Sequence, residues 1–321
     1  MTMVDPAVGS STSQHDPPSI RTEALTKRFP RVTALDGLTV SIGAGVIGLV
    51  GANGAGKSTL IKILLGVLRP TSGRADVLGR DVTTSDRELR ALVGYMPEHD
   101  CLPPDTSATE FVVHMARMSG LPAAAARERT ADTLRHVGLY EERYRPIGGY
   151  STGMRQRVKL AQSLVHDPRL IFLDEPTNGL DPAGRDDMLA LIRRIGTDFG
   201  ISVLVASHLL GELERICDHV VIIDAGRLLR SSEIAAYTRV TEDLVIEVID
   251  GEHDDGAGAL SSRLVRDGVT ARRNGRLVEV RIEDEATYDQ IRDAAAELGI
   301  GLVRLQQRRH HIQEVFTDAT V

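Results

Sequence analysis

Residues 46–67 read VIGLVGANGAGKSTLIKILLGV, and this stretch decides the fold. It begins with a short apolar run, residues 46–50, that has the length of a buried strand. Glycines follow, and then a helical pattern begins. The apolar positions of that pattern are Leu60, Ile63, Leu64 and Val67. A strand, a glycine-rich turn and a helix form the context in which the pattern G-x-x-x-x-G-K-[ST] identifies a phosphate-binding loop. The sequence therefore predicts a nucleotide-binding α/β domain.

The loop itself is GANGAGKST, residues 51–59. Its glycines allow backbone N–H groups to turn toward phosphate oxygens, and the following helix adds the positive end of its dipole. Lys57 supplies a compact charge for the β and γ phosphates, and Ser58 is the expected Mg²⁺ ligand. The residues expected to bind the nucleotide here are Gly51, Asn53, Gly54, Ala55, Gly56, Lys57, Ser58 and Thr59.

Two further strands are predicted to end beside this loop. Residues 168–181 read PRLIFLDEPTNGLD, in which four apolar residues run into Asp174 and Glu175. In an open parallel sheet, ligands lie beyond the carboxyl ends of the strands. Asp174 is therefore expected to hold Mg²⁺ through its waters, and Glu175 to orient or deprotonate an attacking water. The third strand, ISVLVASH, ends at His208, which is expected to contact the γ-phosphate.

A second glycine-bearing motif, GYSTGMRQR, occupies residues 149–157. The helical pattern after it leads directly into the strand that ends at Asp174, so the helix should be antiparallel to that strand, with its N-terminus at the nucleotide edge. Ser151 is the expected N-cap, and Gly153 lets the backbone approach an anion. The preceding segment, about residues 105–150, opens with the capping box SATE and reads as mostly helical. Such an inserted lobe should carry the Ser151 motif away from its own phosphate loop.

The last eighty residues follow a different pattern. They read as a strand (244–249), a short helix (259–268), a hairpin (269–282) that turns at Asn274 and Gly275, a helix (285–299) and a strand (300–308). Asn-Gly between two alternating runs is a strong signal for a type I′ turn. This βαββαβ order predicts a small α+β, ferredoxin-like domain at residues 240–321.

Composition excludes several other classes of protein. The chain has 321 residues, 42% of them apolar, and no apolar run approaches the length of a membrane-spanning helix. Residues 1–19 lack the features of a signal peptide and read as the disordered tail of a cytoplasmic protein. A net charge of −7 offers no basic footprint for nucleic acid. Cys101 and Cys217 have no ligand-like spacing, and RRHH at 308–311 reads as a solvated end.

Four of these motifs, in their order and spacing, resemble a known set. GANGAGKST, YSTGMRQR, LIFLDEPTNGLD and VASH resemble the Walker A, signature, Walker B with D-loop, and switch-histidine motifs of the ATP-binding subunits of ABC transporters, over about residues 20–235. The resemblance implies a P-loop NTPase (ABC ATPase) fold with a helical subdomain inserted at about 100–155, binding ATP and Mg²⁺ and hydrolysing ATP. It also implies that Phe29 stacks on adenine, with a core phenylalanine as the alternative, and that Asp181 belongs to the nucleotide site.

The resemblance further implies how the second motif is used. The cradle formed by Ser151 and Gly153 would meet the γ-phosphate held by a second subunit, so that two copies pack head to tail around two ATP molecules. Two departures from the common pattern, Glu98 in place of Gln and Ser-Thr-Gly-Met in the signature, resemble the type-2 ABC exporter ATPases, which include the daunorubicin-resistance type. Glu98 can still approach Mg²⁺, although it adds negative charge beside Asp174 and Glu175.

The sequence thus favours a homodimeric ATPase on the inner face of the cell membrane that drives a separately encoded permease, an exporter. One alternative is a soluble ABC-type ATPase acting on ribosomes or DNA. Such proteins generally carry two ATP modules or a long coiled coil, whereas this chain has one phosphate loop and no sustained heptads. The other alternative is an importer ATPase, which the two departures disfavour.

Overall fold

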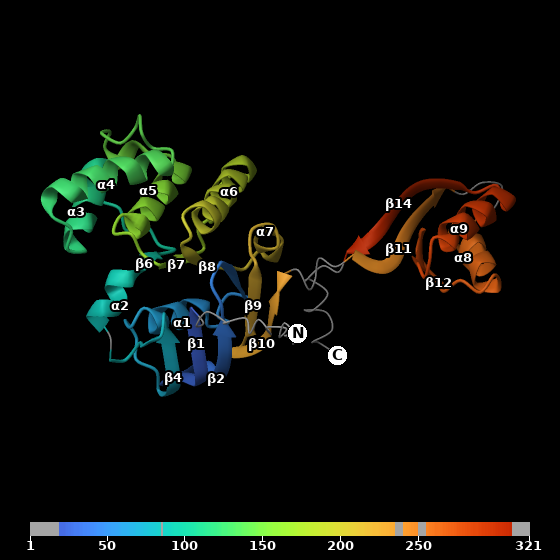
Figure 1. Cartoon of the computed structure of the whole chain (residues 1–321), viewed down its shortest axis with the longest axis horizontal. Coiled ribbons are helices and arrows are strands. Elements are labelled where there is room, and N and C mark those ends of the chain that lie inside the picture. Colours follow the sequence, from blue (N-terminus) through green and yellow to red (C-terminus); the bar gives the residue numbers. More distant parts are fainter. Residues whose placement is uncertain (1–18, 85, 235–239, 250–254, 310–321) are drawn as a thin grey trace, which may run out of the picture. The chain divides into compact units, whose positions relative to one another are not determined.

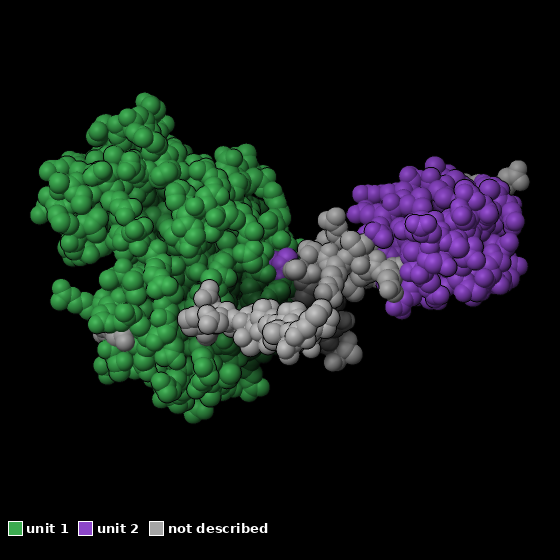
Figure 2. Space-filling view, viewed as in Figure 1, with its two compact units in different colours: residues 1–233 green, residues 234–321 purple. Residues whose placement is uncertain are grey.

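The computed structural model describes residues 19–84, 86–234, 240–249 and 255–309. The chain divides into two compact units, Met1–Glu233 and Ile234–Val321 (Figure 2). Most of the predicted N-terminal tail and part of the RRHH stretch lie outside the described residues. Among the described helices, none combines the length and the apolar character that crossing a bilayer requires.

The first unit contains two sheets and a group of helices (Figure 1). Its strands are β1 (Ile20–Phe29), β2 (Val32–Ile42), β3 (Val46–Val50), β4 (Ser72–Val77), β5 (Arg80–Asp81), β6 (Val93–Met96), β7 (Leu170–Asp174), β8 (Ser202–Ser207), β9 (His219–Asp224) and β10 (Arg227–Glu233). Its helices are α1 (Lys57–Leu64), α2 (Asp86–Leu92), α3 (Ala108–Met118), α4 (Ala123–His136), the short 3₁₀ helix η1 (Ile147–Gly149), α5 (Thr152–Leu164), α6 (Pro182–Asp198) and α7 (Leu210–Leu213).

The six-stranded sheet has the order β10-β9-β3-β8-β7-β6. Strands β3, β6, β7, β8 and β9 run parallel, and β10 pairs antiparallel with β9. Val50 pairs with Ser207, and Asp174 pairs with Ala206, so β3, β7 and β8 end at the same edge. The sequence-based prediction that these three strands end together is confirmed. Parallel strands buried on both faces need continuous apolar runs, and β3, β7 and β8 are buried throughout.

A four-stranded antiparallel sheet of order β2-β1-β4-β5 forms the second layer. One hydrophobic core joins the two sheets through α1, and it includes Leu25, Leu35, Ile61, Phe172 and Leu204. Because α1 is buried in this core, the loop that precedes it is held in place at the edge of the six-stranded sheet.

Helices α3, α4 and α5 lie side by side, in green in Figure 1. A complete capping box starts α3: the N–H of Glu110 donates to Ser107 Oγ at 3.2 Å, and the N–H of Ser107 donates to Glu110 Oε2 at 2.9 Å. Helix α5 then packs against β6 and β7. The predicted route, from an inserted helical segment through Ser151 into the strand ending at Asp174, is therefore present.

The second unit contains β11 (Val240–Ile249), α8 (Gly256–Arg266), β12 (Ala271–Asn274), β13 (Leu277–Arg281), α9 (Ala286–Glu297) and β14 (Gly301–Arg309). Its strands form an antiparallel sheet of order β12-β13-β11-β14. Its hydrophobic core, which includes Ile246, Leu260, Val278 and Ile291, joins the sheet to both helices.

Two local predictions were wrong. The helix after the phosphate loop ends at Leu64, because Gly66 takes a left-handed backbone (φ 67°), and Val67 is 72% exposed rather than buried. The hairpin turns at Gly275 and Arg276, since Asn274 still pairs with Leu277. A type I′ turn requires a positive φ at both central residues. Here Gly275 has a positive φ and Arg276 does not, so the turn is not of type I′.

Candidate functional site

A cavity of about 730 Å³ lies at the edge where β3, β7 and β8 end. It contains most of the predicted site residues. Its lining is Phe29, Val32, Ala34, Ala52, Asn53, Gly54, Gly56, Lys57, Ser58, Thr59, Glu98, Asp174, Glu175, Asn178 and His208. Residues from five separate stretches of the chain therefore meet at one site.

The phosphate loop has the backbone that an anion cradle needs. Gly54 and Gly56 have φ values of 85° and 107°, in the left-handed region that glycine adopts without strain. A Cβ on Gly51 would lie 2.5 Å from the carbonyl oxygen of Ile223, so glycine is required there by space. Ala55 is buried beneath the loop and does not line the cavity. Gly51 and Ala55 thus shape the loop from below.

Helix α1 begins at Lys57 without a side-chain cap, and its N-cap residue is Gly56. The first N–H groups of an α-helix have no partner within the helix, and the helix dipole favours a negative charge beside them. This helix start therefore suits a phosphate group.

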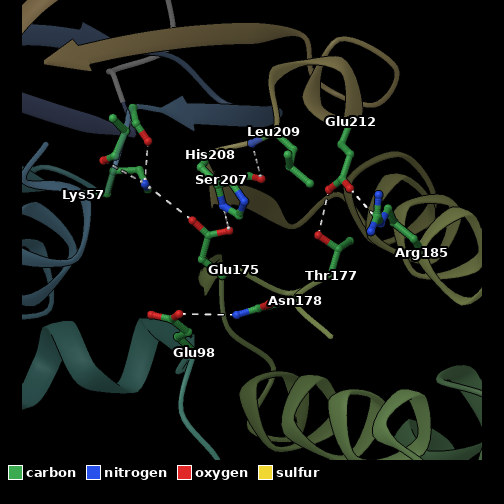
Figure 3. A network of polar contacts seen from close by, with 12 residues as sticks. Lys57, Glu98, Glu175, Thr177, Asn178, Arg185, Ser207, His208, Leu209 and Glu212 are labelled. Atoms are coloured by element: carbon green, nitrogen blue, oxygen red, sulfur yellow. Dashed lines mark hydrogen bonds and ion pairs between the residues drawn. The ribbon is translucent and has the colours of Figure 1, made fainter. Parts of the chain in front are cut away.

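Lys57 is buried between the loop and Glu175 (Figure 3). Its Nζ donates to the carbonyl oxygen of Gly51 at 2.6 Å and lies 3.5 Å from Glu175 Oε1. A buried ammonium needs such partners, because transfer out of water disfavours an unpaired charge.

Glu175 receives a second contact from His208, whose Nδ1 lies 3.0 Å from Glu175 Oε2 (Figure 3). The carboxylate is buried, and it is the first residue after β7. One oxygen faces Lys57 and the other faces His208. The structure thus brings together the three residues predicted to be catalytic.

Asp174 is 3% exposed, and its Oδ1 has no hydrogen-bond partner among the described residues. Burial raises the pKa of Asp174; a hydrogen bond from the Ser58 side chain opposes this rise, and the charge of Glu98 adds to it. An unsatisfied buried carboxylate oxygen beside a serine hydroxyl fits a divalent cation.

Phe29 lies at the end of β1 and lines the cavity, and the residue is 41% exposed. The Nζ of Lys27 is 5.2 Å from the ring centroid. The alternative of a core phenylalanine is therefore wrong.

Ser151, Gly153 and Asp181 lie elsewhere, in a second cavity of about 410 Å³. Ser151 caps α5, and its Oγ accepts from the N–H of Met154 at 3.3 Å. Asp181 caps α6 in the same way, through the N–H of Gly184. This second cavity shares no lining residue with the first.

Helix α5 and His166, two residues beyond its end, are tied to the segment that carries Glu98 by polar contacts spaced about one helical turn apart. These contacts join Arg155 Nε to Asp100 Oδ2 (3.7 Å), Lys159 Nζ to the Glu98 carbonyl (2.8 Å), Gln162 Nε2 to the Tyr95 carbonyl (3.5 Å) and His166 Nε2 to the Val93 carbonyl (2.9 Å). The Glu98 carboxylate itself accepts from Asn178 Nδ2 at 3.4 Å (Figure 3). Sequence reasoning missed Asn178, although it lies within the quoted stretch 168–181.

Comparisons with known proteins identify the family of this chain. Residues 35–178 match the family described as ABC transporter. The chain is 39% identical over 212 residues to the daunorubicin/doxorubicin resistance ATP-binding protein DrrA of Streptomyces peucetius, covering 66% of this chain and 64% of DrrA. It is 33% identical over 305 residues to the daunorubicin resistance ATP-binding protein DrrA3 of Streptomyces coeruleorubidus, covering 94% of this chain and 96% of DrrA3.

A solved structure leads to the same family. The structure of cbiO1 from Clostridium perfringens, part of the ABC transporter complex cbiONQ, matches with a TM-score of 0.63 at 28% identity, over 69% of this chain and 90% of cbiO1. The first unit thus has the P-loop NTPase fold of an ABC ATPase. The chain belongs to the ATP-binding proteins of ABC transporters, among the type-2 exporter ATPases.

Proposed function

We propose that this ABC ATPase works as a head-to-tail homodimer, in which the start of α5 in one copy completes the nucleotide cavity of the other. The observation that carries the proposal is the separation of the two motifs: Ser151 and Gly153 line one cavity, and Lys57 and Glu175 line another. A γ-phosphate contact from the partner makes closure depend on ATP and opening depend on hydrolysis.

Within one copy, the phosphate loop and the start of α1 bind the phosphates, and Lys57 supplies the compensating charge. Phe29 stacks on the adenine, which its exposed ring at the cavity wall supports. Ser58, Asp174 and Glu98 would hold Mg²⁺, and the ion, when bound, neutralises phosphate charge. The unsatisfied Oδ1 of Asp174 supports this assignment.

Glu175 takes a proton from the attacking water, whose oxygen bonds to the γ-phosphorus as the bond to the ADP oxygen breaks. A positioned base of this kind contributes about 10² to 10⁴ in rate. His208 orients the Glu175 carboxylate through its Nδ1 and presents its ring to the γ-phosphate. The 3.0 Å contact supports that role.

The partner that uses this cycle is a separately encoded membrane permease, an exporter, at the inner face of the cell membrane. The names of the relatives support export, since DrrA and DrrA3 are named for drug resistance. No nucleic-acid partner is expected, given the net charge of −7.

We also propose the division of the chain into an ATP-binding domain at 20–235, with its helical subdomain at about 100–155, and an accessory domain at 240–321. The two separate hydrophobic cores support this division. We assign the accessory domain to the ferredoxin-like class, because its element order and its sheet order β12-β13-β11-β14 agree with the split βαβ arrangement.

The proposal is tested by Glu175→Gln, which keeps the shape of the side chain and removes the base. The variant should bind ATP, hydrolyse it at most about 1% as fast as wild type, and elute as a dimer from a size-exclusion column run in MgATP. Unchanged hydrolysis would remove Glu175 from the mechanism.

A further inference from the structure

The backbone of Glu175 has a conformation that few residues with a side chain adopt. Its φ is 52°, in the left-handed region. The N–H of Glu175 donates to the carbonyl of Ala206 at 2.9 Å, and its carbonyl accepts from the N–H of Asn178 at 3.1 Å. Such a conformation persists only where the surrounding structure holds it. The position of the Glu175 carboxylate therefore depends on what fixes the turn that follows.

Thr177, in that turn, is fixed by a carboxylate from another part of the chain (Figure 3). The Thr177 hydroxyl donates to Glu212 Oε2 at 2.7 Å, and both side chains are buried. The other oxygen of Glu212 lies 3.0 Å from Arg185 Nε, on α6. A single carboxylate thus joins the turn, α6 and α7.

Helix α7 places two side chains against the same segment. His208 lies just before this helix and contacts Glu175, whereas Glu212 lies four residues later and contacts Thr177. The Ser207 hydroxyl accepts from the N–H of Leu209 at 3.0 Å, which fixes the start of this arrangement (Figure 3). The distance between Glu175 and His208 therefore depends on the contact between Glu212 of α7 and Thr177 of the turn.

We infer that Glu212 is a positioning residue for ATP hydrolysis: through Thr177 it holds the turn after β7, and with it the Glu175 carboxylate and its contact with His208. This inference rests on the proposed role of Glu175 as the base. A buried carboxylate is costly to desolvate, and an apolar side chain could pack between α6 and α7 equally well. The carboxylate of Glu212 therefore indicates that the Thr177 hydroxyl must be held in place.

The same turn extends to the second cavity, where Gly179, Leu180 and Asp181 lie beside Ser151. Gln156 Nε2 on α5 donates to the carbonyl of Asn178 at 3.1 Å. Glu212 and Gln156 thus both hold the turn. Displacement of the turn would change the catalytic edge and the face offered to a partner copy together.

The inference is tested by removing the Thr177 hydroxyl at constant shape. Thr177→Val should lower kcat about 10-fold to 100-fold, because small misplacements of a catalytic group cost that much. The KM for ATP should stay within about two-fold, since Thr177 does not line the nucleotide cavity. Thr177→Ser, which keeps the hydroxyl, should restore most of the activity. Thr197→Val, at an exposed position on α6, controls for loss of a threonine hydroxyl elsewhere.

Glu212→Met, which removes the acceptor at similar size, gives the second comparison. If the two residues act through one bond, Thr177→Val should lower kcat much less in the Glu212→Met background than in wild type. Equal effects in both backgrounds, or a Thr177→Val enzyme with wild-type kcat, would overturn the inference. Glu175→Gln, assayed in parallel, distinguishes failure of the proposed function from failure of the positioning role. An active Glu175→Gln enzyme would contradict the proposed function. An inactive Glu175→Gln enzyme together with an unimpaired Thr177→Val enzyme would contradict only the positioning role.

Discussion

The ammonium of Lys159, buried on α5, donates to the backbone carbonyl of Glu98 at 2.8 Å. Since Ser151 caps the same helix, this contact ties the Ser151 motif, which we propose a partner copy uses, to the segment that carries Glu98, a proposed Mg²⁺ ligand. Burial lowers the pKa of Lys159, and the neighbouring charges, Asp100, Glu98 and Asp174 among them, oppose that shift. We therefore propose that Lys159 also acts as a counter-charge for the Glu98 carboxylate, whose charge favours the protonated amine.

The first prediction concerns this charge. Lys159→Met should lower kcat about 10-fold, because Glu98 is then left uncompensated beside Asp174 and its segment loses a tether. The loss should be smaller in a Glu98→Gln background, where the extra negative charge is absent. Steady-state ATPase rates of the four enzymes measure this, with Lys62→Met on the exposed face of α1 as the charge-matched control. Equal losses in both backgrounds would contradict the counter-charge role.

The second prediction concerns the start of α5. Ser151→Arg should leave the ATP affinity of the single chain within about two-fold of wild type, because Ser151 does not line the phosphate-loop cavity. Hydrolysis should fall to a few per cent or less, since the cradle can no longer approach the partner's γ-phosphate. Nucleotide titration and ATPase assays check this, with Ser262→Arg on α8 as a control. Parallel loss of affinity and hydrolysis would mean that Ser151 serves its own nucleotide or only the fold.

The third prediction concerns stability in acid. His166 is half-buried, its Nε2 contacts the carbonyl of Val93, and its Nδ1 is buried without a hydrogen-bond partner among the described residues. Burial lowers the pKa of His166 below its usual 6.5. At a pH below 6.5 the unfolded chain therefore binds a proton that the folded chain does not, so stability is complete above this pH and falls as the pH drops through the lowered value.

His166→Gln keeps a donor for the Val93 carbonyl and cannot titrate. Between pH 7.5 and 5.5, urea unfolding should show a smaller loss of stability for this variant than for wild type, by up to about 1 kcal/mol. His219, whose pKa burial also lowers, should retain its share of the acid sensitivity in both proteins. An identical pH dependence in wild type and His166→Gln would contradict the prediction.

The fourth prediction concerns the second unit. Removal of residues 240–321 should spare ATP binding, because every residue that lines the nucleotide cavity lies in the first unit. Isothermal titration with ATP on the purified truncation measures this, and the same truncation with Lys57→Met shows that the binding occurs at the phosphate loop. A folded truncation without ATP affinity would show that the nucleotide site depends on the second unit.

Local sequence patterns predicted the strand ends that form this site. Three buried strands end at Val50, Asp174 and Ser207, and each was visible as an apolar run followed by a glycine loop or by polar residues. The parallel-sheet rule then placed their ends together. The end of α1 before Val67 depended on the left-handed Gly66, which an apolar pattern does not encode.

Contacts between side chains distant in the sequence were not predictable. Thr177 and Glu212 are 35 residues apart, and no periodicity links a turn residue to a later helix. The requirement for glycine at position 51 depends on the Ile223 carbonyl, which the fold alone brings close. The separation of Ser151 from the phosphate loop was expected from the helical segment between them, but the distinct linings of the two cavities needed the structure.

The most direct test of the account mixes two inactive variants, Ser151→Arg and Glu175→Gln. In a head-to-tail heterodimer, one of the two sites combines the intact phosphate loop and Glu175 of the Ser151→Arg chain with the intact Ser151 cradle of the Glu175→Gln chain. ATP hydrolysis should therefore return at that site. Random pairing of symmetric dimers limits the recovery to about a quarter of the wild-type rate. A mixture that stays as inactive as its components, while both variants still bind ATP, would contradict completion of each site by the partner copy.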